Sequence, residues 1–191
     1  MSVLSQSTIA KKVSFSGVGI HTGNKVKMNV LPSTPNTGIV FKRTDLKQNN
    51  IVIPNFENVS EATLCTTVSN QFGVKVSTIE HLMAAFLGLG IDNVVVELDS
   101  QEVPILDGSA RDFVKILKDT GLKNSDVPIK LIKINNRVEI EDENKFISIE
   151  KSNTTLEIEF EINYKNQLIK NQKNKVNVFE DKLDNVFNSR T

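Results

Sequence analysis

Apolar and polar side chains alternate along several short stretches in the first hundred residues. In residues 25–31, Val26, Met28 and Val30 take every second position. Residues 39–42 and 93–98 show similar strand patterns. A period of two places apolar side chains on one face of a β-strand. We therefore expect short strands with one buried face, and a further strand over residues 62–69, which are rich in Thr, Val and Leu.

The spacing changes to that of a helix over residues 77–90. Its apolar residues recur three or four positions apart, at Ile79, Leu82, Met83, Phe86 and Leu89. Ser77 followed three residues later by Glu80 has the spacing of a capping box, which predicts where the helix begins. Gly88 and Gly90 are expected to end it.

A second helix is predicted over residues 110–120, and Gly121 is expected to end it. Asp107 and Ser109 precede it and are expected to cap its first turn. Its buried side chains are predicted to be Phe113, Ile116 and Leu117.

The second half of the chain has a stronger strand pattern and no long helix. Residues 123–128 are polar and are predicted to be a linker, so we expect domains at 1–124 and 125–191. Strands are predicted at 129–134, 137–141, 145–150 and 156–162, and the last of these alternates apolar residues with glutamates. The only helix candidate after it is 180–187. An apolar sheet face without a covering helix suggests that the second domain is truncated.

Composition narrows the possible functions. Lys plus Arg and Asp plus Glu each number 23, so net charge gives no reason to expect binding to nucleic acid. Cys65 is the only cysteine, which excludes an intrachain disulfide and a multi-cysteine zinc site. No run approaches the roughly 18 apolar residues of a membrane-spanning helix, and the first residues lack a signal-peptide core. We expect a cytoplasmic protein.

Glu80 beside His81 is the main candidate for chemistry. A neutral imidazole can ligate a metal, and an adjacent carboxylate can take a proton from water. The alternative is structural, with Glu80 as a helix cap and His81 as a first-turn residue. Gly17–Gly23 is not a phosphate loop, because its glycine spacing misses the dinucleotide fingerprint and a strand follows it. Within it, His21 taken alone is a turn residue.

Six motifs, taken together and in order, resemble the family of bacterial UDP-3-O-acyl-N-acetylglucosamine deacetylases of lipid A synthesis. Each motif alone is weak, but six in sequence cover nearly all of the first domain. They are Gly17-Val-Gly-Ile-His-Thr-Gly23, Lys42-Arg-Thr-Asp45, Thr63-Leu-Cys-Thr66, Ser77-Thr-Ile-Glu-His-Leu82, Gly88-Leu-Gly-Ile-Asp-Asn93 and Pro104-Ile-Leu-Asp-Gly-Ser109.

The resemblance implies an α+β fold with two similar domains, each a sheet with helices, and a zinc site between them. It implies that His81 is a zinc ligand and Glu80 the general base. Thr191, after Arg190, is similar to the threonine that steadies the oxyanion. The other implied contacts with the UDP-3-O-acyl-N-acetylglucosamine substrate are Leu64 and Cys65 near its acyl chain, His21 in a loop near the site, and Lys145 and Tyr164 at its diphosphate and uracil. Tyr164 replaces the family's phenylalanine, and the residues after it depart from the family's pattern.

The family's remaining zinc ligands, a His and an Asp, would be expected beyond Thr191. A later His that assists leaving-group protonation would be expected there too. Two readings therefore stand. The chain is a fragment of a zinc-dependent hydrolase, or it is a non-catalytic α+β piece that at most binds nucleotide-sugar or a partner chain. The sequence predicts nothing about its oligomeric state.

Overall fold

The computed structural model describes residues 4–153 and 156–190 and has an α+β fold. By contacts it divides into two compact units, each described here by itself. In unit 1 the described residues up to Ile129 join those from Asp184 onward, and unit 2 is Lys130–Leu183. The predicted domains at 1–124 and 125–191 stay a prediction.

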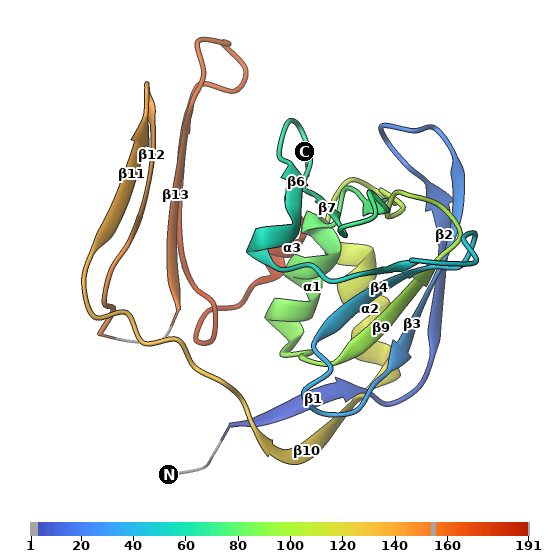
Figure 1. Ribbon diagram of the computed structural model, residues 1–191. Helices are drawn as coiled ribbons and strands as arrows, with labels where there is room; N and C mark the ends of the chain where they lie inside the picture. The colour runs from blue at the N-terminus through green and yellow to red at the C-terminus, as the bar shows by residue number, and fades with distance from the viewer. Residues whose placement is uncertain (1–3, 154–155, 191) are drawn as a thin grey trace. The chain divides into compact units, whose positions relative to one another are not determined.

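A five-stranded mixed sheet in the order β2-β3-β9-β4-β5 forms the centre of unit 1 (Figure 1). The sheet is antiparallel except where β4 runs parallel to β9. Its strands are β2 (Val13–Val18), β3 (Lys25–Pro32), β4 (Ile39–Arg43), β5 (Ile51–Val52) and β9 (Val94–Leu98). The predicted alternation is confirmed, because Val26, Met28 and Val30 of β3 and Val94, Val96 and Leu98 of β9 are buried.

Two helices share the core of this sheet, α1 (Glu80–Leu89) and α2 (Arg111–Thr120). Leu82, Ala85 and Phe86 are the buried residues of α1, and Phe113, Leu117 and Thr120 are those of α2. Ile116 was predicted to be buried but is 38% exposed. Helix α1 continues through Gly88 and ends at Gly90, whose φ of 67° is the left-handed conformation that glycine adopts without strain.

Two smaller sheets complete unit 1. Strand β1 (Ser5–Ile9) pairs antiparallel with β10 (Leu122–Pro128), so the prediction of a linker over residues 123–128 is wrong. Strands β6 (Val59–Glu61), β7 (Thr67–Ser69) and β8 (Lys75–Val76) form the other sheet, after the short 3-10 helix Phe56–Asn58. The last helix, α3 (Asp184–Phe187), is shorter than the predicted 180–187 and contacts α2.

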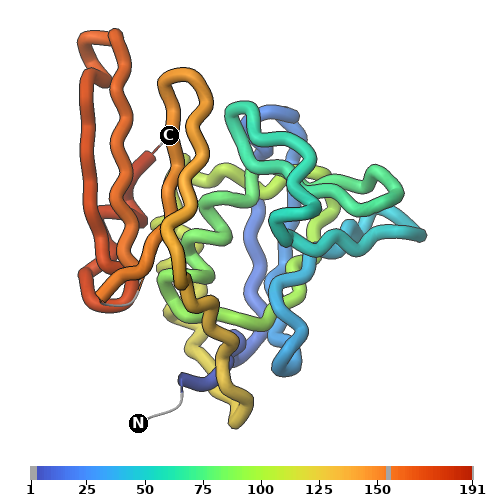
Figure 2. Tube along the Cα trace, turned by 60° about the vertical axis from the view of Figure 1, so that its left-hand side comes forward, coloured from blue at the N-terminus to red at the C-terminus, as the bar shows by residue number. Residues whose placement is uncertain are grey.

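Unit 2 consists of two antiparallel hairpins, drawn in orange and in red in Figure 2. They are β11 (Val138–Asp142) with β12 (Lys145–Ile149), and β13 (Glu157–Asn163) with β14 (Asn171–Asn177). The predicted strand at 129–134 is absent from this described stretch. As expected, the apolar face of β13 lacks full cover, since Ile158 is 42% and Phe160 is 63% exposed.

Candidate active site

Glu80 is the first residue of α1, and its carboxylate holds the loop that joins β6 to β7. Oε2 of Glu80 accepts a hydrogen bond of 3.0 Å from the backbone N–H of Thr66. In return, the backbone N–H of Ile79 donates to the carbonyl oxygen of Thr66 over 3.4 Å. The start of the helix and the loop are therefore fastened to each other by two hydrogen bonds.

The capping box predicted from Ser77 and Glu80 is wrong. The backbone N–H and the hydroxyl of Ser77 both donate to the carbonyl oxygen of Gln101, and no side chain caps α1. The alternative interpretation of Glu80 as a helix cap is therefore also wrong. Its carboxylate serves a loop fourteen residues away in sequence rather than its own helix.

Glu80 and His81 both keep polar atoms available for a ligand. Among the residues that the structure describes, Oε1 of Glu80 and the imidazole of His81 have no hydrogen-bond or ion-pair partner. Both residues are half-buried. A carboxylate oriented through one oxygen and open at the other can act as a proton acceptor, and a neutral imidazole can act as a metal ligand.

Leu64 and Cys65 lie in the loop that Glu80 holds. The strand predicted over residues 62–69 is wrong for 62–66, because only Thr67–Ser69 forms β7. Leu64 has a φ of 61° and is 88% exposed, whereas Cys65 is half-buried with its Sγ 3.7 Å from Oγ1 of Thr67. Cys65 directly precedes Thr66, whose backbone N–H donates to Glu80, so the structure brings this loop to the Glu80 carboxylate.

His21 lies exposed in the turn between β2 and β3, and a buried carboxylate holds that turn. The backbone N–H groups of His21 and Thr22 donate to Glu102 over 3.0 and 2.8 Å, and the Thr22 hydroxyl donates over 2.7 Å. Burial alone would raise the pKa of Glu102, but these donors and the Thr78 hydroxyl lower it below its ordinary value of 4.5. Glu102 is therefore ionised at neutral pH, and sequence reasoning had not selected it.

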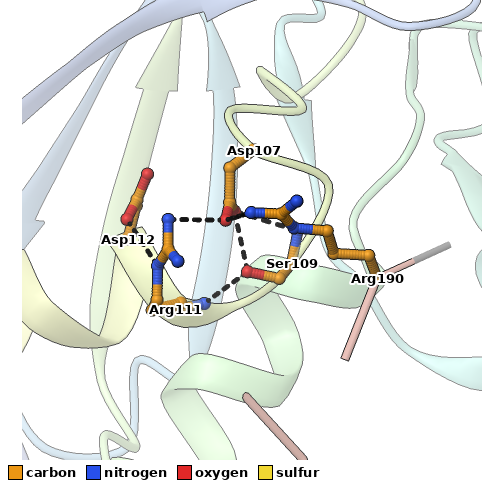
Figure 3. Close-up of polar contacts among 5 residues, drawn as sticks. All are labelled: Asp107, Ser109, Arg111, Asp112 and Arg190. Atoms are coloured by element: carbon orange, nitrogen blue, oxygen red, sulfur yellow. Dashed lines mark hydrogen bonds and ion pairs between the residues drawn. The ribbon is translucent and has the colours of Figure 1, made fainter. Parts of the chain in front are cut away.

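Asp107 is the centre of a polar cluster at the start of α2 (Figure 3). It accepts hydrogen bonds from the backbone N–H and hydroxyl of Ser109, and it pairs with Arg111 at 2.8 Å and Arg190 at 3.2 Å. The Ser109 hydroxyl is the first cause of its lowered pKa, with the backbone N–H of Ser109 and the two arginines adding to it against burial. Ser109 Oγ accepts from the backbone N–H of Arg111 over 3.2 Å. The N-cap of α2 is Ala110, however, and no side chain caps the helix, so the capping predicted for Asp107 and Ser109 is wrong.

Arg190, the last described residue of the chain, lies beside the turn that contains Asp107 (Figure 3). Thr191, predicted as the oxyanion residue, lies outside the described residues. Lys145 is the first residue of β12 and Tyr164 follows β13; both are exposed and belong to unit 2. Their predicted contacts with the nucleotide stay predictions.

The described residues do not by themselves fit a catalytic zinc ion. Such a site has three protein ligands and one open position. Within residues 4–153 and 156–190, no group of three or more His, Cys, Asp or Glu side chains is placed to hold a metal. Of the residues that the sequence selected, only His81 was predicted as a metal ligand, and the described residues bring no second and third ligand to it.

Comparison with known proteins gives a consistent match. A family model described as UDP-3-O-acyl N-acetylglycosamine deacetylase matches residues 6–191. UDP-3-O-acyl-N-acetylglucosamine deacetylases from Shewanella oneidensis and Shewanella baltica are each 46% identical over 144 residues, which cover 75% of this chain and 47% of each relative. The chain thus spans about half the length of the curated relatives it matches. In the described ranges, no helix is long and apolar enough to cross a membrane.

Proposed function

Because the chain belongs to the UDP-3-O-acyl N-acetylglycosamine deacetylase family, we propose that it carries the general base and one metal ligand of such an enzyme. The proposed reaction is hydrolysis of the N-acetyl group of UDP-3-O-acyl-N-acetylglucosamine. The observation that supports it most is the Glu80 carboxylate, which is fixed through one oxygen to Thr66 and lies beside a histidine whose ring has no partner among the described residues.

Hydrolysis of an acetamide needs a water molecule to attack the carbonyl carbon and a group to accept the water's proton. Glu80 is suited to this role because Thr66 orients the carboxylate and leaves Oε1 open. Its place as the first residue of α1 fixes the backbone from which the carboxylate extends. The C–N bond of the acetamide then breaks, and the leaving amine takes a proton from the protonated Glu80 carboxyl or from a second acid.

We propose zinc as the metal and His81 as one of its ligands. Zinc held by three protein ligands lowers the pKa of a bound water to about 7 and polarises a carbonyl. His81 offers a nitrogen of the type that zinc binds, and further ligands are needed beyond those that the described residues bring together.

The substrate contacts follow from the resemblance and remain proposals. Leu64 and Cys65 are proposed to meet the acyl chain, and their loop is the one that Glu80 holds. Lys145 and Tyr164 are proposed at the diphosphate and uracil, His21 near the site, and Thr191 at the oxyanion. The cytoplasm is the expected location, and balanced charge gives no reason to propose nucleic acid as a partner.

A non-catalytic role is the second candidate, because the described residues lack a group of three metal ligands. In that case the chain would bind nucleotide-sugar or a partner chain without turnover. The two candidates differ in one respect that can be measured, namely whether the Glu80–His81 pair supports hydrolysis once a full ligand set is supplied.

A chimera tests the proposed function. This chain replaces the matching part of the Shewanella oneidensis relative, and the purified chimera is assayed for acetate release from UDP-3-O-acyl-N-acetylglucosamine. We expect turnover by the chimera and none by the 191-residue chain alone. A folded chimera that binds the substrate but releases no acetate would favour the non-catalytic role.

A further inference from the structure

Glu102 is a fully buried carboxylate with no cationic partner among the described residues. Burying a charge is costly unless hydrogen bonds replace its lost hydration. Four donors surround it. Oε1 accepts from the His21 N–H at 3.0 Å and the Thr78 hydroxyl at 2.9 Å, while Oε2 accepts from the N–H and hydroxyl of Thr22. One carboxylate oxygen therefore joins the His21 turn to the residue two positions before Glu80.

The backbone around Glu102 is attached to the same segment. The Ser77 N–H donates to Gln101, and the Val103 N–H donates to the carbonyl oxygen of Ser77. Residues 101–103 thus run alongside the chain as it enters α1. The neighbouring Thr78 has a φ of 57°, an unfavourable conformation for a β-branched residue, and its hydroxyl bond to Glu102 helps to hold it there.

The His21 turn approaches Glu102 closely because residue 19 is glycine. A Cβ atom added at Gly19 would lie 2.2 Å from Oε2 of Glu102 and 2.6 Å from Oγ1 of Thr22. Any side chain at this position would force the turn away from the carboxylate. The close approach at Gly19 and the four donors together indicate that the Glu102 carboxylate has a specific structural role in holding the turn.

We propose that Glu102 is a positioning residue that fixes the His21 turn relative to the start of α1. Because Glu80 is the first residue of α1, Glu102 thereby also positions the Glu80 carboxylate. The connection runs from Glu102 through Thr78 and Ile79 to Glu80 and the Thr66 loop. Its meaning for catalysis rests on the proposed function, because Glu80 is the base only in that case. The mechanical connection itself does not depend on it.

Amide hydrogen exchange measured by NMR on the 191-residue chain tests this connection. In Glu102→Gln, an amide with a single acceptor oxygen faces four donors. We expect the N–H groups of His21 and Thr22 to exchange at least about tenfold faster, equivalent to about 1.4 kcal/mol. The Thr66 N–H, which reports on the Glu80 carboxylate, should speed up as well. The N–H of Val96, in the centre of the sheet, should change less than about twofold.

Thr78→Val and Thr78→Ser form the matched pair. Valine keeps the shape of threonine but removes the bond to Oε1, so the Thr66 N–H should exchange faster while His21 and Thr22 keep their protection. Serine keeps the hydroxyl and should restore slow exchange at Thr66. An unchanged Thr66 rate in Glu102→Gln or Thr78→Val would overturn the proposal. So would an equal acceleration at Val96, which would mean global destabilisation.

The chimera separates this proposal from the proposed function. If the chimera is active, Glu102→Gln should lower kcat more than it changes KM, and Thr78→Ser should retain the rate of the unmodified chimera. If Glu102→Gln lowered kcat while its Thr66 N–H exchanged at the unmodified rate, the loss of activity would not come from this connection, and the proposal would be contradicted. An inactive unmodified chimera would count against the proposed function and leave the exchange results to decide on Glu102.

Discussion

We expect Glu80→Gln in the chimera to lower kcat for deacetylation by about 10² to 10⁴, the usual contribution of a general base, while KM changes little. Glutamine has nearly the same shape, and its carbonyl oxygen can still accept the hydrogen bond from Thr66. It cannot accept the proton of the attacking water. Steady-state kinetics with the purified variant provides the measurement.

Glu61→Gln is the matched control, because Glu61 is exposed at the end of β6 and carries the same charge. It should leave kcat within about twofold of the unmodified chimera, since surface substitutions away from such sites are usually near neutral. Full activity of Glu80→Gln would mean that the carboxylate only fastens the Thr66 loop. A parallel loss in both variants would point to the charge of the region rather than to a base.

Replacing Phe86 with alanine should destabilise unit 1 by about 3 to 5 kcal/mol, because the side chain is fully buried in α1 and leaves a cavity. Urea denaturation followed by circular dichroism should show a lower midpoint with an unchanged slope. The position of Glu80 and His81 depends on this packing, since both residues lie in the first turn of the same helix.

Leu87→Ala is the control for this packing. Leu87 is the next residue on α1 and is 46% exposed, so its truncation should cost less than about 1 kcal/mol. Similar losses at the two positions would contradict the assignment of the buried face. A smaller loss at Phe86 than at Leu87 would mean that α1 packs with a different face toward the sheet.

Local periodicity predicted the sheet and helices of unit 1 well where one face is buried. The alternation in β3 and the helical spacing in α1 follow directly from burial on one side, and both are confirmed. Strand β10 was missed because its residues are polar and its partner β1 lies more than a hundred residues earlier in the chain. Pairing over such a distance leaves no local pattern.

The candidate site was only partly predictable. Glu80 and His81 were selected from their place at a helix start. The hydrogen bond from Thr66 to Glu80 was not predicted, because the spacing of Ser77 and Glu80 indicated a capping box instead. Glu102 was missed because its donors, His21 and Thr22, lie about eighty residues away. One signal was present in the sequence, since Glu102 directly precedes the apolar run Val103–Leu106.

The metal content of the chimera tests the roles of Glu80 and His81 most directly. Each protein is dialysed against a weak chelator, and zinc is then measured by atomic absorption. We predict about one zinc per chain in the unmodified chimera and in Glu80→Gln, and far less than one in His81→Ala, because histidine nitrogen is a zinc ligand whereas the base is not. Full zinc content in His81→Ala, or loss of zinc in Glu80→Gln, would contradict the assignment.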